Sequence, residues 1–339
     1  MISTCLDLAL LCHPVLAFLS IQRPKMAAPI SKWQYFLLSF LSLLAIRYAS
    51  TTNASPQVPV LHEIQEAVEQ AVCQTVDQPN PIASLYPTNA TGTLNGTISV
   101  LPISLDLARK LIPSQYRILE HAYRHLLPDF PEGMYPALLQ AVHDHGVQAF
   151  GFQIPDFSRG GIEFPFLDLL GDNATSFKWT PSLLMSAENV IAIGGAADYG
   201  IKTYPSLFEP ACDAYSAVPD AKEPRTTSFE ATSAEAGAAS ISTRLSLTSE
   251  EKYPLGFFMN ITNQVMFGDG KQCDNMIRLF NTSLTTSPNK IETVKGTVKV
   301  SGFPLESEQE FECAYGIRFS SAFIENNYLP CENFRNYGA

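Results

Sequence analysis

The feature of this sequence that most constrains its fold is a series of short strand-like segments separated by turn residues. Glycine, proline, asparagine or aspartate bounds each segment, as in the turn Gly268-Asp269-Gly270. Apolar and β-branched runs of this length between turn signals are typical of strands, which predicts a mainly β (α+β) protein of antiparallel architecture. The predicted strands are residues 97–103, 148–154, 182–193, 240–247, 256–265 and 292–300. The predicted helices are residues 105–111, 115–126 and 135–143.

The composition limits the size of the core and the class of partner. The 339 residues are 46% hydrophobic, which is enough for one large core or two modest ones. The formal net charge is −11 and no basic stripe occurs, whereas the phosphates of nucleic acids require surfaces rich in Lys and Arg. We therefore expect no nucleic acid among the partners.

The N-terminal segment has the pattern of a secretory leader. Residues 35–46, YFLLSFLSLLAI, follow Lys32 and are too short for a comfortable membrane span, but they suit the apolar region of a signal peptide. Cleavage is expected within residues 50–55, and Met26 is the predicted true start. The leader is assigned to residues 1–54, and no membrane span is expected after cleavage. The alternative is an uncleaved signal anchor flanked by Arg47.

Glycosylation sequons favour the same compartment. The pattern Asn-x-Ser/Thr needs exposure in the secretory lumen, so six copies predict a secreted glycoprotein. The six asparagines are Asn53, Asn89, Asn95, Asn173, Asn260 and Asn281.

Cysteine usage agrees with an oxidising compartment. Five cysteines remain after the leader, which predicts two disulfides and one spare thiol. Cys313 and Cys331 are predicted to pair because both lie near the C-terminus. No CxxC occurs, so we expect no metal cluster. The five are Cys73, Cys212, Cys273, Cys313 and Cys331.

Four histidines are candidate metal ligands. His121 and His125 share one face of a predicted helix, and His143 and His145 are two residues apart. No HExxH motif accompanies them, because Ala122 follows His121. A structural role is therefore favoured over zinc.

Two segments outside the strand series have their own patterns. Residues 61–73 carry apolar residues at helical spacing and predict an amphipathic helix, followed by a Pro- and Asn-rich linker over 77–95. Residues 218–237 predict an exposed loop, either a disordered insertion or a cover over a site.

One lysine lies in an apolar and aromatic stretch. In Val190–Glu209, VIAIGGAADYGIKTYPSLFE, the neighbours of Lys202 include Ile201, Tyr199 and Tyr204. Desolvation lowers the pKa of an ammonium and frees the amine as a nucleophile toward carbonyls, which is Schiff-base chemistry. The alternative is that Lys202 extends its amine to water from a strand end.

Three blocks of the sequence together resemble the acetoacetate decarboxylase family. The stretch containing Lys202 is similar to the family run AIAVGRExxxYPKKxxxPKLF, with Lys202 on the imine-forming lysine. Residues 97–118, TISVLPISLDLARKLIPSQYRI, resemble the opening strand and short helix. Residues 257–279, FFMNITNQVMFGDGKQCDNMIRL, resemble the later hairpin.

The resemblance implies a fold, a domain and a reaction. The fold would be an antiparallel β-barrel or cone with peripheral helices, over residues 95–320, after a helix and linker at 55–94 and before a tail at 321–339. The reaction would be decarboxylation of a β-keto acid by a lysine Schiff base, with no cofactor or metal. The inserted apolar segment 123–141 and the leader favour a larger acid, such as a polyketide-derived one in toxin or secondary-metabolite synthesis. The family also tends to form homo-oligomers.

The resemblance departs from the family pattern around the lysine. Thr203 replaces the second lysine, Gly194-Gly195-Ala196 replaces Gly-Arg-Glu, and Leu94 falls near the family's arginine. Glu163 is the candidate proton-shuttling carboxylate and Arg159 the candidate cation for a substrate carboxylate. The candidate substrate contacts also include Tyr199, Tyr204 and Phe164.

Two other functions stay open. An aldolase, dehydratase or cyclase would use the same imine lysine. A secreted binding protein for an apolar ligand would form no imine, so covalent trapping separates it from both enzymes.

Overall fold

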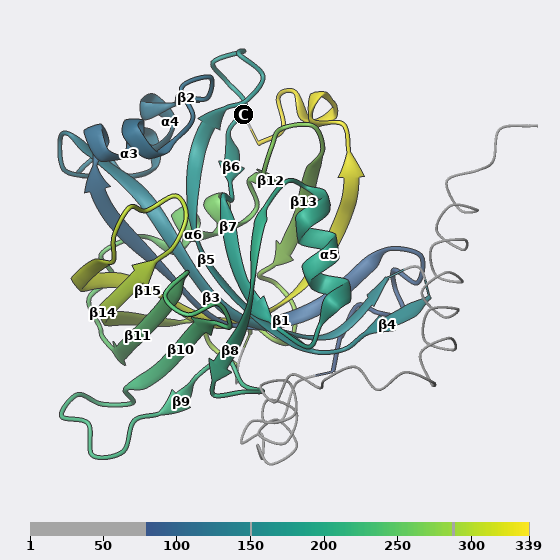
Figure 1. The fold of residues 1–339 in the computed structure, drawn as a ribbon, viewed down its shortest axis with the longest axis vertical. Helices are drawn as coiled ribbons and strands as arrows, with labels where there is room; N and C mark the ends of the chain where they lie inside the picture. The colour runs from purple at the N-terminus through teal and green to yellow at the C-terminus, as the bar shows by residue number, and fades with distance from the viewer. Residues whose placement is uncertain (1–78, 150, 287–288, 339) are drawn as a thin grey trace, which may run out of the picture. The chain divides into compact units, whose positions relative to one another are not determined.

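The computed structural model describes residues 79–149, 151–286 and 289–338. Its strands form one 15-stranded sheet of mixed direction, because β7 and β8 are parallel, as are β6 and β12, and the other pairs are antiparallel (Figure 1). The prediction of a mainly β fold is confirmed. The strands are β1 (Ala90–Ser104), β2 (Arg117–Ile118), β3 (Met134–Ala149), β4 (Phe152–Ile154), β5 (Phe157–Asp168), β6 (Phe177–Trp179), β7 (Ser182–Ser186), β8 (Lys202–Glu209), β9 (Ser216–Ala217), β10 (Thr227–Ser233), β11 (Ser240–Leu247), β12 (Val265–Phe267), β13 (Cys273–Leu279), β14 (Glu292–Ser301) and β15 (Gln309–Leu329).

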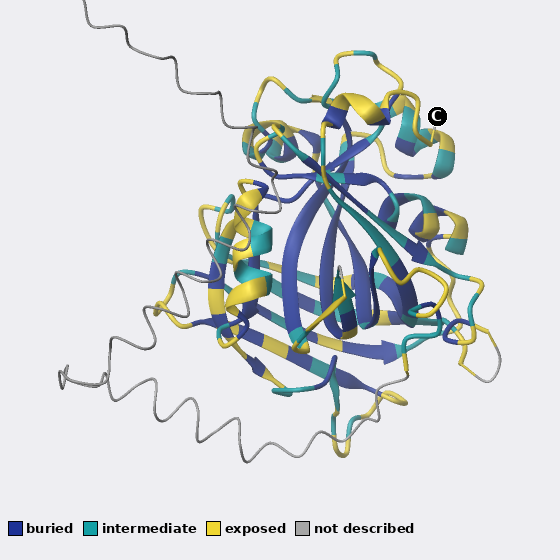
Figure 2. Ribbon diagram, turned by 90° about the vertical axis from the view of Figure 1, so that its right-hand side faces the viewer, coloured by how far each residue is buried: buried dark blue, intermediate teal, exposed yellow. Residues whose placement is uncertain are grey.

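The sheet branches and closes on itself twice. A larger ring runs β5-β7-β8-β10-β11-β14-β15-β1-β3 and returns to β5, because β3 pairs with β5. A smaller ring runs β5-β6-β12-β13-β15-β1-β3 and returns to β5, because β13 pairs with β15. The shared wall is therefore β5, β3, β1 and β15. Strands β1, β3 and β5 are buried along most of their length, whereas β15 is buried mainly in its middle (Figure 2).

The larger ring encloses the apolar core. The rings of Phe208 and Phe229 lie 5.7 Å apart inside it. A Cβ on Gly160 of β5 would lie 2.8 Å from Ile241 Cδ1 and 3.3 Å from Gln140 O, so a larger residue here would force the Ile241 side chain to move. The shared wall and β10–β11 thus pack directly on one another.

The helices lie between strands and differ in part from the prediction. They are α3 (Leu105–Leu111), α4 (Glu120–Leu126), α5 (Val190–Asp198), α6 (Leu255–Thr262) and the 3₁₀ helix η1 (Cys331–Phe334). Helix α3 coincides with the predicted 105–111, and Ser104 Oγ caps it by accepting from Leu107 N at 3.1 Å. Of the predicted helix 115–126, residues 117–118 are strand β2 and only 120–126 are helical.

Two predicted elements are wrong in type, and a third is right only in its first half. The predicted helix 135–143 is part of strand β3, whose two faces are both buried, so the alternation that marks a half-exposed strand is missing. The predicted strand 256–265 is mostly helix α6, in which Phe257, Phe258 and Ile261 are buried together on one side. The predicted strand 182–193 stops at Ser186, and α5 follows with Asn189 as its side-chain cap.

The remaining element predictions are mixed. Strands β11 and β14 coincide with 240–247 and 292–300 to within one residue, and β1 contains 97–103. The predicted strand 148–154 is divided between the end of β3 and β4. The predicted loop 218–237 contains strand β10, so it is not an insertion without structure.

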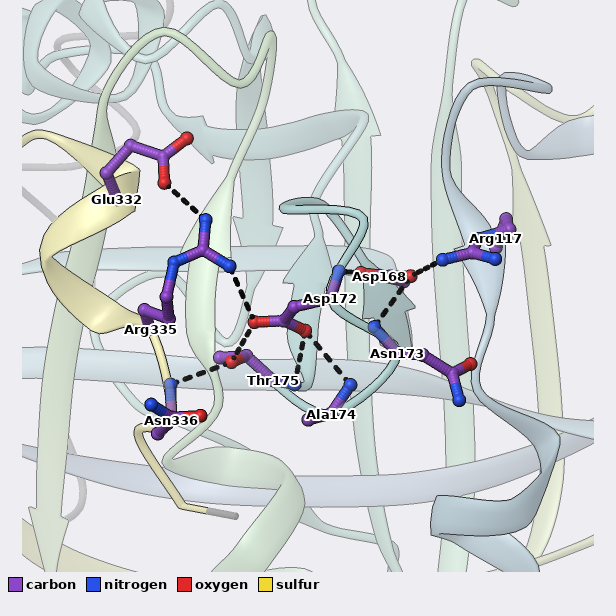
Figure 3. A network of polar contacts seen from close by, with 9 residues as sticks. All are labelled: Arg117, Asp168, Asp172, Asn173, Ala174, Thr175, Glu332, Arg335 and Asn336. Carbon is purple, nitrogen blue, oxygen red and sulfur yellow. Dashed lines mark hydrogen bonds and ion pairs between the residues drawn. The ribbon is translucent and has the colours of Figure 1, made fainter.

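The C-terminal tail is held by a disulfide and by a polar network. Cys331 pairs with Cys273 of β13, so the predicted pairing with Cys313 is wrong; the Cys313 thiol is free and exposed. Cys212 is also disulfide-bonded. Arg335 Nη1 lies 3.3 Å from Oδ2 of Asp172, a residue of the loop between β5 and β6 (Figure 3). The tail is therefore part of the fold.

That loop is ordered by its own carboxylates. Asp172 accepts from the backbone N–H groups of Ala174 and Thr175, both at 2.9 Å, and these bonds lower its pKa. Asp168 is buried and pairs with Arg117 of β2 (Figure 3). The loop carries the Asn173 sequon, with Asn173 exposed.

The predictions on targeting are tested only in part. The leader, the helix 61–73 and the Asn53 sequon lie outside the described residues. Asn173 and Asn281 are exposed, whereas Asn95 is half-buried within β1 between β3 and β15, with its Oδ1 buried. Within the described ranges, no helix is long and apolar enough to cross a membrane.

Candidate functional site

The smaller ring has a charged interior. Three cations and four carboxyl groups project from the strands of this ring, and we call them the charge cluster. Its members are Arg159 and Glu163 of β5, Asp144 of β3, Lys178 of β6, Asp274 and Arg278 of β13, and Glu325 of β15. All except the partly exposed Glu325 are buried. Since buried charges are costly unless paired, a cluster of this size needs an explanation.

Strand alternation places these side chains on one face. Arg159 and Glu163 are four residues apart on β5 and so point to the same side. In β3 the facing partners of Glu163 and Arg159 are Leu138 and Val142, and Asp144 follows on the same side. This side of the shared wall faces the smaller ring, and the opposite side faces the apolar core.

Two ion pairs organise the cluster. Arg159 Nε donates to Asp144 Oδ2 at 2.7 Å, and Arg159 Nη2 donates to Asp144 Oδ1 at 3.2 Å. Lys178 Nζ lies 3.1 Å from Glu163 Oε2, with both side chains 4% exposed. The guanidinium pair is bidentate, whereas the ammonium pair is a single contact.

The two paired cations differ in pKa. Burial lowers the pKa of Lys178, and the attraction of Glu163 only partly offsets this because Arg278 and Arg159 oppose it. Burial also lowers the pKa of Arg159, but Asp144 together with Glu163 and Glu325 outweighs burial and raises it above the usual value. Of these two cations, only Lys178 has a lowered pKa, so its ammonium loses a proton more readily than that of a free lysine.

Asp274 and Glu325 share the other end of the cluster. Burial raises the pKa of Asp274 well above its ordinary value, and the hydrogen-bonded Glu325 adds to the rise. Burial also raises the pKa of Glu325. One proton on this pair leaves three carboxylates facing three cations, so the cluster is neutral when the pair is singly protonated.

An apolar wall adjoins the cluster. Leu183, Met185, Tyr199 and Ile201 form a separate buried group packed beneath α5. Met266 of β12, which faces both Lys178 and Asp274 in the sheet register, contacts this group. The charged groups therefore have an apolar boundary on one side.

The phenol of Tyr199 points toward the carboxyl pair. Its oxygen accepts from Tyr328 N at 2.9 Å, and the two rings stack with centroids 5.1 Å apart. Burial raises the pKa of Tyr199, and Asp274 and Glu325 raise it further. Tyr199 therefore stays protonated beside the pair, and it is the one predicted aromatic contact that lies near the cluster.

Lys202 is not in the desolvated setting that the sequence predicts. It is an exposed residue at the start of β8, and its Nζ lies 4.8 Å from the ring centroid of Tyr204 and 6.0 Å from that of Phe303. Tyr204 belongs to the apolar core of the larger ring, so Lys202 follows the strand face that points away from the charge cluster. The prediction that Lys202 is desolvated is wrong, because its apolar neighbours Tyr199 and Ile201 turn inward without it.

Of the other predicted site residues, some lie in the charge cluster and others lie in or beside the apolar core. Glu163 and Arg159 are both buried, and the fold brings them together in the cluster. Phe164 is buried on the other face of β5, with its ring 5.3 Å from that of Trp179, and is part of the apolar core. In the described part of the chain, no hydrogen bond joins Tyr204 to the cluster. Its hydroxyl oxygen accepts a hydrogen bond from Phe303 N at 3.2 Å.

Four residues of the cluster, Lys178, Asp274, Arg278 and Glu325, were not predicted from the sequence as site residues. The most informative of them is Lys178. It stands between Phe177 and Trp179, both buried, in a strand of three residues. A lysine flanked by two aromatic residues and bounded by Pro181 was the available signal. It was weak, because three residues are too few for a periodicity to be recognised.

The histidines have structural contacts. His143 Nδ1 lies 2.9 Å from Ser158 Oγ, and His145 Nδ1 lies 2.9 Å from Thr93 Oγ1. No group of three or more His, Cys, Asp or Glu side chains in the described part of the chain could hold a metal ion.

Comparison with known proteins finds similarity in structure only. No protein-family model and no curated protein matches the chain. The enduracididine biosynthesis enzyme MppR with bound HEPES buffer is similar, with a TM-score of 0.42 and 10% identity over 71% of this chain and 86% of that one. MppR complexed with the condensation product of pyruvate and imidazole 4-carboxaldehyde gives a TM-score of 0.40 and 9% identity, over 76% of this chain and 96% of that one. An acetoacetate decarboxylase-like enzyme from Sphingomonas wittichii RW1 gives a TM-score of 0.41 and 9% identity over 76% of this chain and 100% of that one.

Proposed function

We propose that this protein is an enzyme that forms a Schiff base between Lys178 and the ketone of an oxo acid, and that it decarboxylates a β-keto acid through this imine. The observation that carries the proposal is the buried Lys178, whose pKa is lowered by desolvation and whose amine lies 3.1 Å from Glu163. A desolvated amine is a nucleophile toward carbonyls, and the adjacent carboxylate can take its proton.

The proposed reaction needs no other cofactor. Glu163 accepts a proton from the Lys178 ammonium, and the neutral amine adds to the ketone carbon. Glu163 returns the proton to the carbinolamine oxygen, which leaves as water and gives the iminium ion. The bond to the carboxylate carbon breaks, carbon dioxide leaves, and the electron pair enters the iminium to form an enamine. Protonation at carbon and addition of water release the ketone and restore the amine.

The remaining cluster residues have roles in this scheme. The carboxyl pair of Asp274 and Glu325 holds a proton that can be delivered to the enamine carbon, and Tyr199 is a neutral donor beside it. The apolar wall of Leu183 and Met185 favours loss of the substrate's charge as carbon dioxide forms. It also supports an acid longer than acetoacetate, such as a polyketide-derived one.

An aldol or dehydration reaction from the same imine is the second candidate. The observation that favours it is the carboxyl pair, because elimination of water from an aldol adduct requires an acid held in its protonated form. Loss of carbon dioxide separates the two reactions, since only decarboxylation releases it.

The test is covalent trapping with borohydride. The protein is incubated with acetoacetate or with 3-oxooctanoate, reduced, digested and mapped by mass spectrometry. We expect an adduct at Lys178 that is more abundant with the longer acid, and no adduct there in Lys178→Arg, which keeps the cation but cannot form the imine.

The matched control is Lys202→Met, which removes the lysine that the sequence favours. An adduct lost in Lys202→Met and kept in Lys178→Arg would move the chemistry to Lys202. No adduct on a folded wild-type protein would refute both enzyme functions and leave the non-catalytic binding protein.

A further inference from the structure

The charge cluster and the adjoining Gln140 contain hydrogen-bond donors that nothing in the described structure satisfies. Arg278 Nε and Gln140 Nε2 are buried without a hydrogen-bond partner among the described residues, and the two residues are 3% and 0% exposed. Buried donors are almost always satisfied, so each unsatisfied one requires an explanation. These two belong to neighbouring side chains, since Arg278 Nη2 donates to Gln140 Oε1.

Arg278 is also the one cation of the cluster without a carboxylate partner in the described structure. Arg159 pairs with Asp144 and Lys178 pairs with Glu163, whereas Arg278 Nη1 donates to the neutral carbonyl oxygen of Thr262 at 3.2 Å. Burial and the nearby Arg159 lower the pKa of Arg278 to about 10, so it is still a cation at neutral pH. A buried, unpaired guanidinium is costly, and an anion beside it would remove that cost.

The position of these donors suits an anionic group on a substrate of Lys178. Arg278 is close enough to Lys178 to oppose its protonation electrostatically. Arg278 follows Asp274 and Met276 on the same face of β13, and Met276 is partly exposed. An anion held by Arg278 and Gln140 would therefore share the smaller ring with the amine.

We propose that Arg278 and Gln140 form a carboxylate-binding subsite, and that the bound carboxylate is one that the reaction leaves in place. This inference rests on the proposed function of Lys178. A carboxylate that leaves as carbon dioxide must lose its charge, and ion pairing with a guanidinium stabilises that charge and opposes the loss. The carboxylate that leaves therefore lies elsewhere, against the apolar wall. The substrate class is an oxo diacid rather than an oxo monoacid.

The first experiment measures binding without reaction. Calorimetry compares butanoate with the uncharged butanamide, neither of which has a ketone for Lys178. We expect the wild type to bind butanoate about tenfold or more tightly than butanamide, as for a hydrogen bond to a charged group. Arg278→Met and Gln140→Leu should remove the preference, and the surface control Lys299→Met should keep it.

The same variants have a structural readout. Replacing an unpaired buried cation by Met should leave the melting temperature unchanged or raise it, whereas a purely structural arginine would lower it. A wild type without preference for butanoate, or a preference that persists in Arg278→Met, would overturn the subsite. Butanoate cannot form an imine, so its binding does not depend on the chemistry of Lys178. Failure of trapping at Lys178 would therefore refute the proposed function but leave the measured preference for butanoate valid.

The second experiment tests the retained carboxylate. Wild type is compared on 3-oxohexanedioate, which would give 4-oxopentanoate and carbon dioxide, and on 3-oxohexanoate of equal length. We expect kcat/KM to be about tenfold or more higher for the diacid, mainly because its KM is lower. Arg278→Met should abolish this difference between the two acids. Equal kcat/KM for the two acids in the wild type would contradict the oxo-diacid class.

Discussion

At the scale of single residues, the protein separates two lysines that the sequence presents in similar surroundings. Lys202 has apolar neighbours on both sides along the chain, yet it is exposed, because alternate side chains of β8 point to opposite faces. Lys178 has its ammonium in the smaller ring with Glu163 as its partner. Local composition around a strand residue therefore does not determine its solvation; the face to which it points does.

The carboxyl pair predicts a pH dependence of stability. The pKa of Asp274 is raised in the folded state, so the folded protein binds more protons than the unfolded chain above the ordinary aspartate pKa of about 3.9. This stabilisation is complete below that pH and is lost as the pH rises through the folded pKa. We expect Asp274→Asn to flatten the fall in unfolding free energy with rising pH, measured by urea denaturation between pH 3 and 9.

Asp172 provides a control of opposite sign. Its pKa is lowered by the N–H groups of Thr175 and Ala174, so its stabilisation is present above the ordinary pKa and lost as the pH falls through the folded one. Asp172→Asn should change the profile only by removing this loss at low pH. A profile of Asp274→Asn that runs parallel to the wild type would rule out the raised pKa.

At the scale of elements, the disulfide joins the two strands that carry the carboxyl pair. Cys273 begins β13 directly before Asp274, and Cys331 follows β15, on which Glu325 lies. The register between these strands shifts beside Cys273, where Tyr328 adopts a positive φ of 56° and contacts Tyr199. The disulfide thus closes the smaller ring next to the site.

Removal of the disulfide should lower stability and also loosen the site. The bond closes a loop with a sequence separation of 58, for which the loss of chain entropy predicts about 4 kcal/mol of stabilisation. We expect Cys331→Ser to lower the unfolding free energy by an amount of this order and to reduce trapping at Lys178 under conditions where the variant is still folded. Cys313→Ala, at a free and exposed thiol, should change neither. Unchanged trapping in folded Cys331→Ser would confine the disulfide to a stabilising role.

At the scale of the whole molecule, two rings share one wall and have opposite interiors. The larger ring is filled mainly by apolar and aromatic side chains, with a few buried polar groups such as the His143–Ser158 pair, whereas the smaller one holds three cations and four carboxyl groups. The larger ring therefore supplies the hydrophobic stabilisation, and the smaller ring carries a cost that is consistent with a functional site.

The charged interior of the smaller ring predicts that the buried Lys178–Glu163 pair lowers the stability of the fold while it serves the reaction. Breaking the pair with Lys178→Met alone leaves Glu163 unpaired and should cost about 3–5 kcal/mol, whereas Lys178→Met with Glu163→Leu should be as stable as the wild type or more so. Trapping should be absent in both variants. The measurement is the unfolding free energy of the four proteins of the double-mutant cycle. A double variant less stable than the single one would mean that the pair is structural.

Sequence patterns predicted the fold class and several elements, and they failed where burial removes periodicity. The strands β11 and β14 and the helix α3 were predicted closely because each has one exposed face. Strand β3 was predicted as a helix, because both of its faces are buried and its pattern has no period of two. Cys331 was assigned the wrong partner, because distance along the chain says little about distance across a closed sheet.

The sequence by itself determined that this chain is mainly β and that Glu163 and Arg159 were candidates for a site. Tertiary structure alone decided that these two residues meet Lys178, Arg278 and the carboxyl pair. The physical reason is the branching of the sheet at β5 and β15, since the smaller ring forms only when β6, β12 and β13, which are far apart from β3 in the chain, close over one face of the shared wall. A ring closure of this kind fixes which side of each strand is desolvated, and no local pattern encodes it.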